Sequence, residues 1–361
     1  MRFSALAVLA AAFAGATNAL PVIEKRGNST ASDDLGLSSV QGLNVTYSST
    51  YNASLPNVVI FATGGTIAGS SSSNTDTTGY QAGVVGVAAL VQSVPELLGI
   101  ANVVGSQISN IGSQDMNATI VLKMAKLANE ILCSEGSNVD GLVITHGTDT
   151  AEETLYFNGP ANLLQAVTLA GNPDARDRGA MIVLNDRIGS AYYTIKTNAN
   201  TLETFRALEQ GYLGMFLSSK AVFYYPPVQP TFKKTFDITN VTSLPMVDVL
   251  YGHQDFDYLL IRAAVADGAK GIVIAGTGAG SQTTPSMPDI DALIAKGFPV
   301  VASSKVNVGA VVPDNDKSSF IRSGFLNPVK SRMQLQLALA CGYSLSEIRS
   351  SFEDVLYNYL H

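Results

Sequence analysis

The chain has 361 residues, of which 46% are hydrophobic and 14% are charged, and its formal net charge is -7. This length is sufficient for two α/β domains with substantial cores. The acidic balance argues against a nucleic-acid partner or an anionic membrane surface, because both bind basic proteins.

The first 19 residues have the features of a secretory signal peptide. Arg2 supplies the positive end, Leu6 to Ala16 is apolar, and small residues lead up to Ala19. The apolar run is too short to span a bilayer, and no later segment is long and apolar enough to do so. We therefore expect export, either into the medium or into the cell-wall or periplasmic space.

Residues 20–54 are rich in Ser, Thr and Asn, and this composition predicts a flexible arm. Asparagine sequons occur five times, and in a secreted chain they are candidate glycosylation sites: Asn28, Asn44, Asn52, Asn117 and Asn240. The two cysteines, Cys133 and Cys341, can pair in a secreted protein but are too few to hold a fold.

From Pro56 onward, apolar β-rich runs alternate with segments of helical period, which predicts an α/β fold with a largely parallel sheet. The predicted strands are 58–62, 141–145, 180–185, 246–251, 271–275 and 299–303. The strand-poor, proline-containing stretch 224–243 predicts a linker. It would separate an N-terminal domain, 55–223, from a smaller C-terminal domain, 244–361.

Three helices have recognisable ends. A helix at 116–132 has Asp115 where an N-cap belongs, and a helix at 330–341 ends before Gly342. Ser344 and Glu347 have the spacing of a capping box, which predicts the start of a final helix.

Two threonine-rich loops each follow an apolar, strand-like run, at 63–69 and 145–154. Ligands of open α/β sheets bind at the carboxyl ends of the strands, so the two loops predict one active site. Glycines before Thr66 allow close backbone approach, and this threonine is a reasonable nucleophile if a neighbour takes its proton. The alternative is a tight strand-to-helix turn with a capping threonine.

Other chemistries lack their motifs. No lysine follows the first loop as a P-loop requires, and no G-x-S-x-G elbow occurs. The histidines, His146, His253 and His361, are scattered, and His146 is interpreted as a structural residue beside the second loop. We expect no metal and no cofactor.

The strings ATGGTIAG and ITHGTDTAEET resemble the paired signature loops of the L-asparaginase family, in particular the bacterial type II enzymes and their secreted fungal relatives. Further matching strings occur at 79–83, 110–116, 195–198 and 323–328, so that the similarity covers about residues 55–355. The resemblance implies a larger N-terminal domain with a mostly parallel sheet, a smaller C-terminal α/β domain, and hydrolysis of L-asparagine to L-aspartate and ammonia.

The resemblance also implies roles for individual residues. Thr66 would form the acyl-enzyme, and Tyr80 would lie in a lid over the site and assist proton transfer. Thr148, Asp149 and Lys196 would form a second hydroxyl–carboxylate–amine group, in which a lysine amine beside an aspartate relays protons.

Substrate binding is implied for four residues: Ser113, Gln114, Asp149 and Ser281. The first three would hold the α-carboxylate and α-ammonium of the substrate. Ser281 belongs to a loop that would reach the site from a partner subunit, and some relatives have asparagine where Ala279 stands. The family resemblance therefore implies a homo-oligomer, a tetramer, with active sites between subunits.

The chain departs from the family pattern after Phe157, which is followed at once by Asn158. Roughly two dozen family residues are missing there, including one central strand of the sheet. Secreted relatives pair a cysteine at the position of Cys133 with one in the absent segment.

Two alternatives to an L-asparaginase remain open: a glutaminase-asparaginase of broader specificity, and a catalytically dead relative that binds amino acids.

Overall fold

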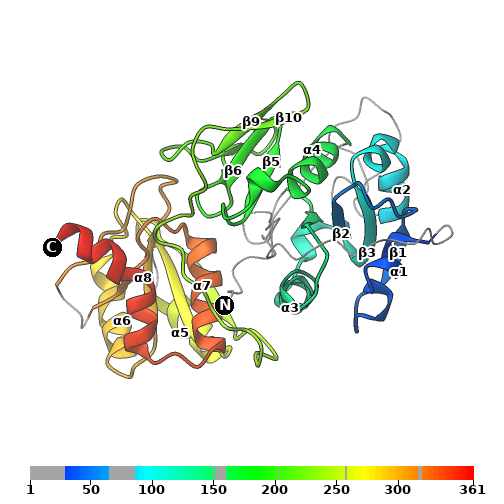
Figure 1. Ribbon diagram of the computed structural model, residues 1–361. Coiled ribbons are helices and arrows are strands. Elements are labelled where there is room, and N and C mark those ends of the chain that lie inside the picture. The colour runs from blue at the N-terminus through cyan, green and yellow to red at the C-terminus, as the bar shows by residue number, and fades with distance from the viewer. Residues whose placement is uncertain are drawn as a thin grey trace. The chain divides into compact units, whose positions relative to one another are not determined.

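The computed structural model (Figure 1) consists of two compact units, which we describe separately. Within the described residues, one unit runs to Gln229 and the other is Pro230–His361. The residues that the structure describes are 29–64, 86–148, 150, 160–201, 203–256, 258–315 and 319–361.

The first unit contains a four-stranded sheet in the order β1-β3-β2-β4. β2 (Asn57–Gly64) lies in the middle and pairs in parallel with β3 (Asn102–Ile111) and with β4 (Gly141–Thr145). β1 (Val45–Ser48) is antiparallel to β3. Every residue of β2 and β4 is buried, as expected of parallel strands covered on both faces.

The segment 29–54, which its composition assigned to a flexible arm, instead forms regular structure. It contains α1 (Ala31–Asp34), the 3₁₀ helix η1 (Leu37–Ser39) and β1. The Asn52 N–H donates to Asn102 Oδ1 at 2.7 Å, at the start of β3. The prediction was wrong here because pairing with β3, remote in sequence, supplies stabilisation that local composition does not reveal.

The predicted long helix is confirmed as α3 (Ala118–Cys133), which buries one apolar face. Its N-cap is Asn117 rather than the predicted Asp115, and Asn117 Oδ1 accepts the N–H of Ile120 at 3.1 Å. Asp115 lies in the preceding 3₁₀ helix η4 (Ser113–Asp115), so the chain becomes α-helical later than the sequence indicated. The other helices of this unit are α2 (Val87–Gln92), η3 (Pro95–Gly99), α4 (Pro160–Ala170) and η5 (Pro173–Ala175).

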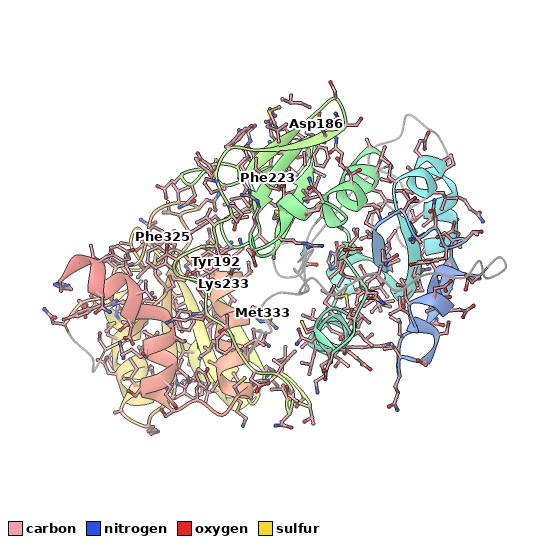
Figure 2. All side chains as sticks on the ribbon, in the orientation of Figure 1. Asp186, Tyr192, Phe223, Lys233, Phe325 and Met333 are labelled. Carbon is pink, nitrogen blue, oxygen red and sulfur yellow. The ribbon has the colours of Figure 1, made fainter. Side chains whose placement is uncertain are left out.

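A second, antiparallel sheet of this unit has the order β10-β9-β6-β5. Its strands are β5 (Met181–Leu184), β6 (Arg187–Ser190), β9 (Gly214–Leu217) and β10 (Lys220–Phe223). The Arg178 guanidinium lies 3.7 Å from the centre of the Phe223 ring, a residue labelled in Figure 2. A separate two-stranded sheet joins β7 (Ile195–Lys196) and β8 (Phe205–Arg206).

The second unit is a smaller α/β domain with a parallel sheet in the order β11-β12-β13-β14. Its strands are β11 (Val247–Tyr251), β12 (Gly271–Gly276), β13 (Val300–Ser304) and β14 (Ile321–Arg322). Its helices are α5 (Tyr258–Ala266), η6 (Thr284–Ser286), α6 (Met287–Ile294), α7 (Pro328–Ala340) and α8 (Leu345–Leu360). The α/β class predicted from the sequence is confirmed.

The predicted caps of the two C-terminal helices, at the end of α7 and at the start of α8, are confirmed. Gly342 follows α7 with a φ of 73°, the left-handed conformation that glycine adopts readily. The capping box of α8 is present in both directions, because Ser344 Oγ accepts the Glu347 N–H and the Glu347 carboxylate accepts the Ser344 N–H.

None of the described helices is long and apolar enough to cross a membrane.

Candidate functional site

The parallel register of β2, β3 and β4 places their carboxyl ends at the same edge of the sheet. These ends are Gly64, Ile111 and Thr145. The first threonine-rich loop leaves β2 at this edge and the second leaves β4, its direct neighbour. The structure thus brings the starts of both loops together, as predicted.

Two hydrogen bonds, one of them fully buried, join the three strands near these ends. Thr63 Oγ1 donates to the Thr145 carbonyl at 2.8 Å, and Ser109 Oγ donates to the Thr63 carbonyl at 2.9 Å. The sequence did not predict a role for Ser109, because β3 itself was not predicted. Gly105 and several polar residues interrupt β3, so that no apolar run identifies this segment as a strand. Polar residues of β3 bond to β2 instead: Gln107 Nε2 donates to the Ala62 carbonyl at 3.2 Å, and Ser109 bonds to Thr63.

Gly64 is required by the close approach of β3. Its φ is +100°, and a Cβ on this residue would lie 2.5 Å from the Ile111 carbonyl oxygen and 2.6 Å from the Ile111 nitrogen. Any side chain would therefore force β2 and β3 apart.

The second loop contacts a lysine from a distant part of the chain. Lys196, on β7, donates from Nζ to Thr148 Oγ1 at 3.1 Å, and both residues are partly buried. Two of the three members of the predicted proton-relay group are therefore in hydrogen-bond contact. The third, Asp149, lies outside the described residues, as do Thr66 and Tyr80.

Ser113 lies beside the same loop. It is 5% exposed, and its carbonyl accepts the hydroxyl of Thr150 at 2.6 Å. This bond ties η4, which follows β3, to the loop that follows β4. Gln114, the next residue, is exposed to solvent. Ser113 and Gln114 therefore lie next to the second loop, at the sheet edge where β3 and β4 end.

His146 is a buried neutral imidazole. It is 0% exposed, its Nδ1 is 2.8 Å from the Gly147 carbonyl, and burial lowers its pKa to about 4. A neutral ring that donates from Nδ1 leaves Nε2 as an acceptor, and Nε2 has no partner in the described part of the chain. As the pH falls below about 6.5, the unfolded chain binds a proton here that the folded chain rejects, so His146 makes the fold less stable in acid.

The remaining predicted residues lie elsewhere. Ser281 is exposed in the second unit, where its backbone exchanges hydrogen bonds with Thr277 at 2.8 and 3.0 Å.

Among the sequons, Asn28 lies outside the described residues, and the other four asparagines are exposed: Asn44, Asn52, Asn117 and Asn240. Cys133 and Cys341 are free thiols. No cluster of three or more His, Cys, Asp or Glu side chains suited to a metal occurs within the described ranges.

Comparison with known proteins shows similarity along both units. The family model "Asparaginase, N-terminal" matches residues 57–158 and 154–229, and "Glutaminase/Asparaginase C-terminal domain" matches 246–352. "Probable L-asparaginase 1" of Schizosaccharomyces pombe is 44% identical over 329 residues, covering 84% of this chain and 90% of that protein.

Two further relatives differ in their stated location. "Probable L-asparaginase periplasmic" of Haemophilus influenzae is 35% identical over 350 residues, covering 89% of this chain and 98% of that protein. The crystal structure of "Probable Cytoplasmic L-asparaginase" from Campylobacter jejuni is 36% identical, with a TM-score of 0.77, and the match covers 82% of this chain and 99% of that one.

Proposed function

The chain belongs to the asparaginase family, and from this premise we propose that it hydrolyses L-asparagine to L-aspartate and ammonia. The observation that carries the proposal is the contact between Lys196 and Thr148, next to the strand ends from which both threonine-rich loops leave. An amine and a hydroxyl in direct contact can pass a proton between them.

The reaction follows from a threonine nucleophile in the first loop. Thr66 Oγ attacks the side-chain amide carbon of asparagine, forming a carbon–oxygen bond as the carbon–nitrogen bond breaks. The proton from the hydroxyl leaves with the nitrogen as ammonia. Water then cleaves the ester, which releases aspartate and restores the Thr66 hydroxyl.

The second loop supplies the proton relay. Lys196 donates to Thr148 in the ground state, and Asp149, next in the chain, is the carboxylate of the group. Asp149 also accepts the substrate α-ammonium, while Ser113 and Gln114 bind the α-carboxylate. Tyr80 assists proton transfer from the lid, and Ser281 of a second copy completes the site in a homotetramer.

The proposal is tested by measuring ammonia release from L-asparagine, with L-glutamine beside it, on the protein expressed in a secreting host. We expect release from asparagine to be the faster reaction. Comparable rates with both amides would instead identify a glutaminase-asparaginase. A folded protein that binds aspartate and releases no ammonia from either amide would contradict the proposal and identify an amino-acid-binding relative.

Replacing Lys196 by methionine is expected to lower kcat by about 10²- to 10⁴-fold, the usual contribution of a positioned proton-transfer group. Lys196→Arg should lower kcat as well, because a guanidinium keeps the positive charge but does not release a proton. Lys220→Met, on the exposed face of β10, removes one positive charge elsewhere in the same unit and should leave kcat unchanged. Full activity in Lys196→Arg would show that Lys196 acts through charge alone.

We further propose that the protein is exported and glycosylated. The signal-like residues 1–19 and the exposed sequons support this, although the relatives include one named periplasmic and one named cytoplasmic. We also propose that the two domains are 55–223 and 244–361, joined by a linker at 224–243.

A further inference from the structure

Lys196 lies on a very short strand. β7 consists of Ile195 and Lys196, and it pairs with β8 through Ile195 with Arg206 and Lys196 with Phe205. Two strands of this length are not stable by themselves in water. Lysine also has a flexible four-carbon side chain, so its amine stays at a fixed point only if the backbone that carries it is held. The 3.1 Å contact of Lys196 with Thr148 Oγ1 therefore requires further bonds around β7.

Thr204 supplies such bonds from the position directly before β8. Its carbonyl accepts the Thr197 N–H at 2.7 Å and the Thr197 hydroxyl at 2.8 Å. Its hydroxyl accepts the Asn198 N–H at 3.1 Å and donates to the Asn198 carbonyl. Thr204 thus bonds to both of the residues that follow Lys196 in the chain, and we call this set of bonds the Thr204 clamp.

The clamp is attached to the hydrophobic core through β8. Phe205 is 4% exposed and lies in one hydrophobic cluster with Ile182 and Leu184 of β5. The carbonyl of Phe205 also accepts the hydroxyl of Tyr212 at 3.2 Å. Thr204 itself is 4% exposed. The backbone that follows Lys196 is therefore bonded to a buried and anchored part of the fold.

The bonds to Asn198 depend on the side chain of Thr204. The carbonyl bonds to Thr197 can form with any residue at position 204, whereas the bonds to Asn198 need an oxygen that both accepts and donates. Valine has nearly the shape of threonine but has no such oxygen, and serine has the hydroxyl without the methyl group. The two substitutions therefore separate the hydroxyl of Thr204 from its volume.

We propose that Thr204 is a positioning residue for proton transfer. Its hydroxyl holds the segment after β7 so that Lys196 Nζ stays within hydrogen-bond distance of Thr148. The inference rests on the proposed asparagine hydrolysis, in which Lys196 belongs to the proton relay, and Thr204 acts through Lys196 rather than on the substrate. A catalytic group displaced by about 1 Å can lower the rate by about 100-fold, so loss of the hydroxyl should reduce kcat.

The kinetic test compares Thr204→Val with Thr204→Ser. Thr204→Val should lower kcat by about 10- to 100-fold and leave KM within about twofold, because proton transfer is impaired and substrate binding is not. Thr204→Ser should restore kcat to within about threefold of the wild-type value, since the hydroxyl is present. The matched control is Thr201→Val, an exposed threonine of the same loop whose hydroxyl bonds to the Glu203 carbonyl at 3.4 Å, and its kcat should not change.

The Lys196→Met background separates positioning from a general loss of structure. If Thr204 acts through Lys196, adding Thr204→Val to Lys196→Met should lower kcat no further, because residues that act as a unit are not additive. Equal decreases in both backgrounds would overturn the proposal, as would a wild-type kcat in Thr204→Val or a Thr204→Ser variant as slow as Thr204→Val. If Thr204→Val does not fold, Thr197→Val removes a bond from the other side of the clamp and takes its place in the same comparison.

A measurement without turnover distinguishes this proposal from the proposed hydrolysis. Acetylation by acetic anhydride, quantified by mass spectrometry, reports the accessibility of the Lys196 amine relative to that of Lys220 in the same protein. Thr204→Val should raise the acetylation of Lys196 at least about fivefold, because the segment that carries it opens more often, and Thr204→Ser should not. If the wild-type protein releases no ammonia, the proposed hydrolysis fails while acetylation still tests the clamp. Unchanged acetylation in Thr204→Val would overturn the positioning role.

Discussion

Thr66→Ala is expected to reduce asparagine hydrolysis by at least about 10⁴-fold, because removing a nucleophile eliminates the covalent route rather than weakening it. Thr66→Ser keeps an attacking hydroxyl and should retain measurable turnover. The distinguishing measurement is mass spectrometry of enzyme quenched in acid during turnover. Wild-type protein should carry one added aspartyl group, and Thr66→Ala should carry none.

Thr148→Ala provides the matched comparison, because Thr148 is the other hydroxyl of the proposed site and contacts Lys196. If Thr66 is the nucleophile, Thr148→Ala loses turnover through slower proton transfer but still forms the aspartyl adduct. An adduct in Thr66→Ala that disappears in Thr148→Ala would transfer the nucleophilic role to the second loop. Near wild-type turnover by Thr66→Ala would exclude the proposed mechanism altogether.

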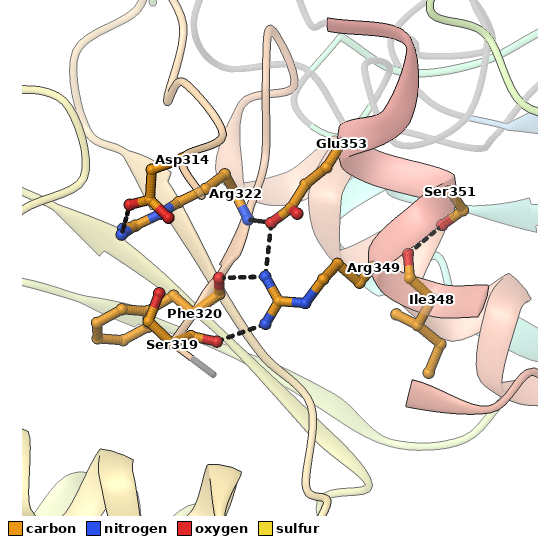
Figure 3. Close-up of polar contacts among 8 residues, drawn as sticks. All are labelled: Asp314, Ser319, Phe320, Arg322, Ile348, Arg349, Ser351 and Glu353. Carbon is orange, nitrogen blue, oxygen red and sulfur yellow. Dashed lines mark hydrogen bonds and ion pairs between the residues drawn. The ribbon is translucent and has the colours of Figure 1, made fainter. Parts of the chain in front are cut away.

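The largest effect on stability is expected from the ion pair that attaches α8 to the chain leading into β14 (Figure 3). Arg349 donates to the Glu353 carboxylate at 2.8 Å and to the carbonyl of Phe320 at 2.8 Å, while the same carboxylate oxygen accepts the N–H of Arg322. Glu353 is 1% exposed and Arg349 is 9% exposed. Removing either partner leaves a charge buried without compensation.

Arg349→Met and Glu353→Leu should each destabilise the C-terminal unit by about 3–5 kcal/mol, and the double variant by less than the sum of the two. Urea unfolding monitored by hydrogen exchange at α8 measures this unit separately. The matched control is Glu203→Ala, which breaks the exposed pair with Arg206 and should cost at most about 1 kcal/mol. Additive effects of Arg349→Met and Glu353→Leu would show that the pair contributes no coupling.

The sequence predicted the parts of the fold that local pattern determines. All six predicted strands are present within a residue or two, since each is an apolar run, and five of the six lie in parallel pairings. β1 and β3 were missed because the pairing of β3 with both β1 and β2 compensates for polar residues and glycine in these strands. The N-cap of α3 was misplaced by two residues because Asp115 and Asn117 are both good caps and only η4 decides between them.

The candidate site was predictable to a similar extent. Parallel strands and two hydroxyl-rich loops imply a shared sheet edge, and the structure places Thr148, Lys196 and Ser113 in or beside the second loop. The bonds that hold the edge together, from Thr63 and Ser109, were not predictable, because they depend on the register between strands far apart in the sequence. Family resemblance alone identified Lys196, an otherwise ordinary lysine.

Asn117 combines two uses of one side-chain amide. Its oxygen accepts the N–H of Ile120 in the first turn of α3, whereas a sugar attached at its sequon would occupy the nitrogen. Carbohydrate and helix start are therefore compatible on the same residue. A deglycosylation mutant made as Asn117→Ala would lose the cap as well, at about 1 kcal/mol, and could be mistaken for an effect of the missing sugar. Thr119→Ala removes the sequon and leaves the cap intact, so it separates the contribution of the glycan from that of the helix.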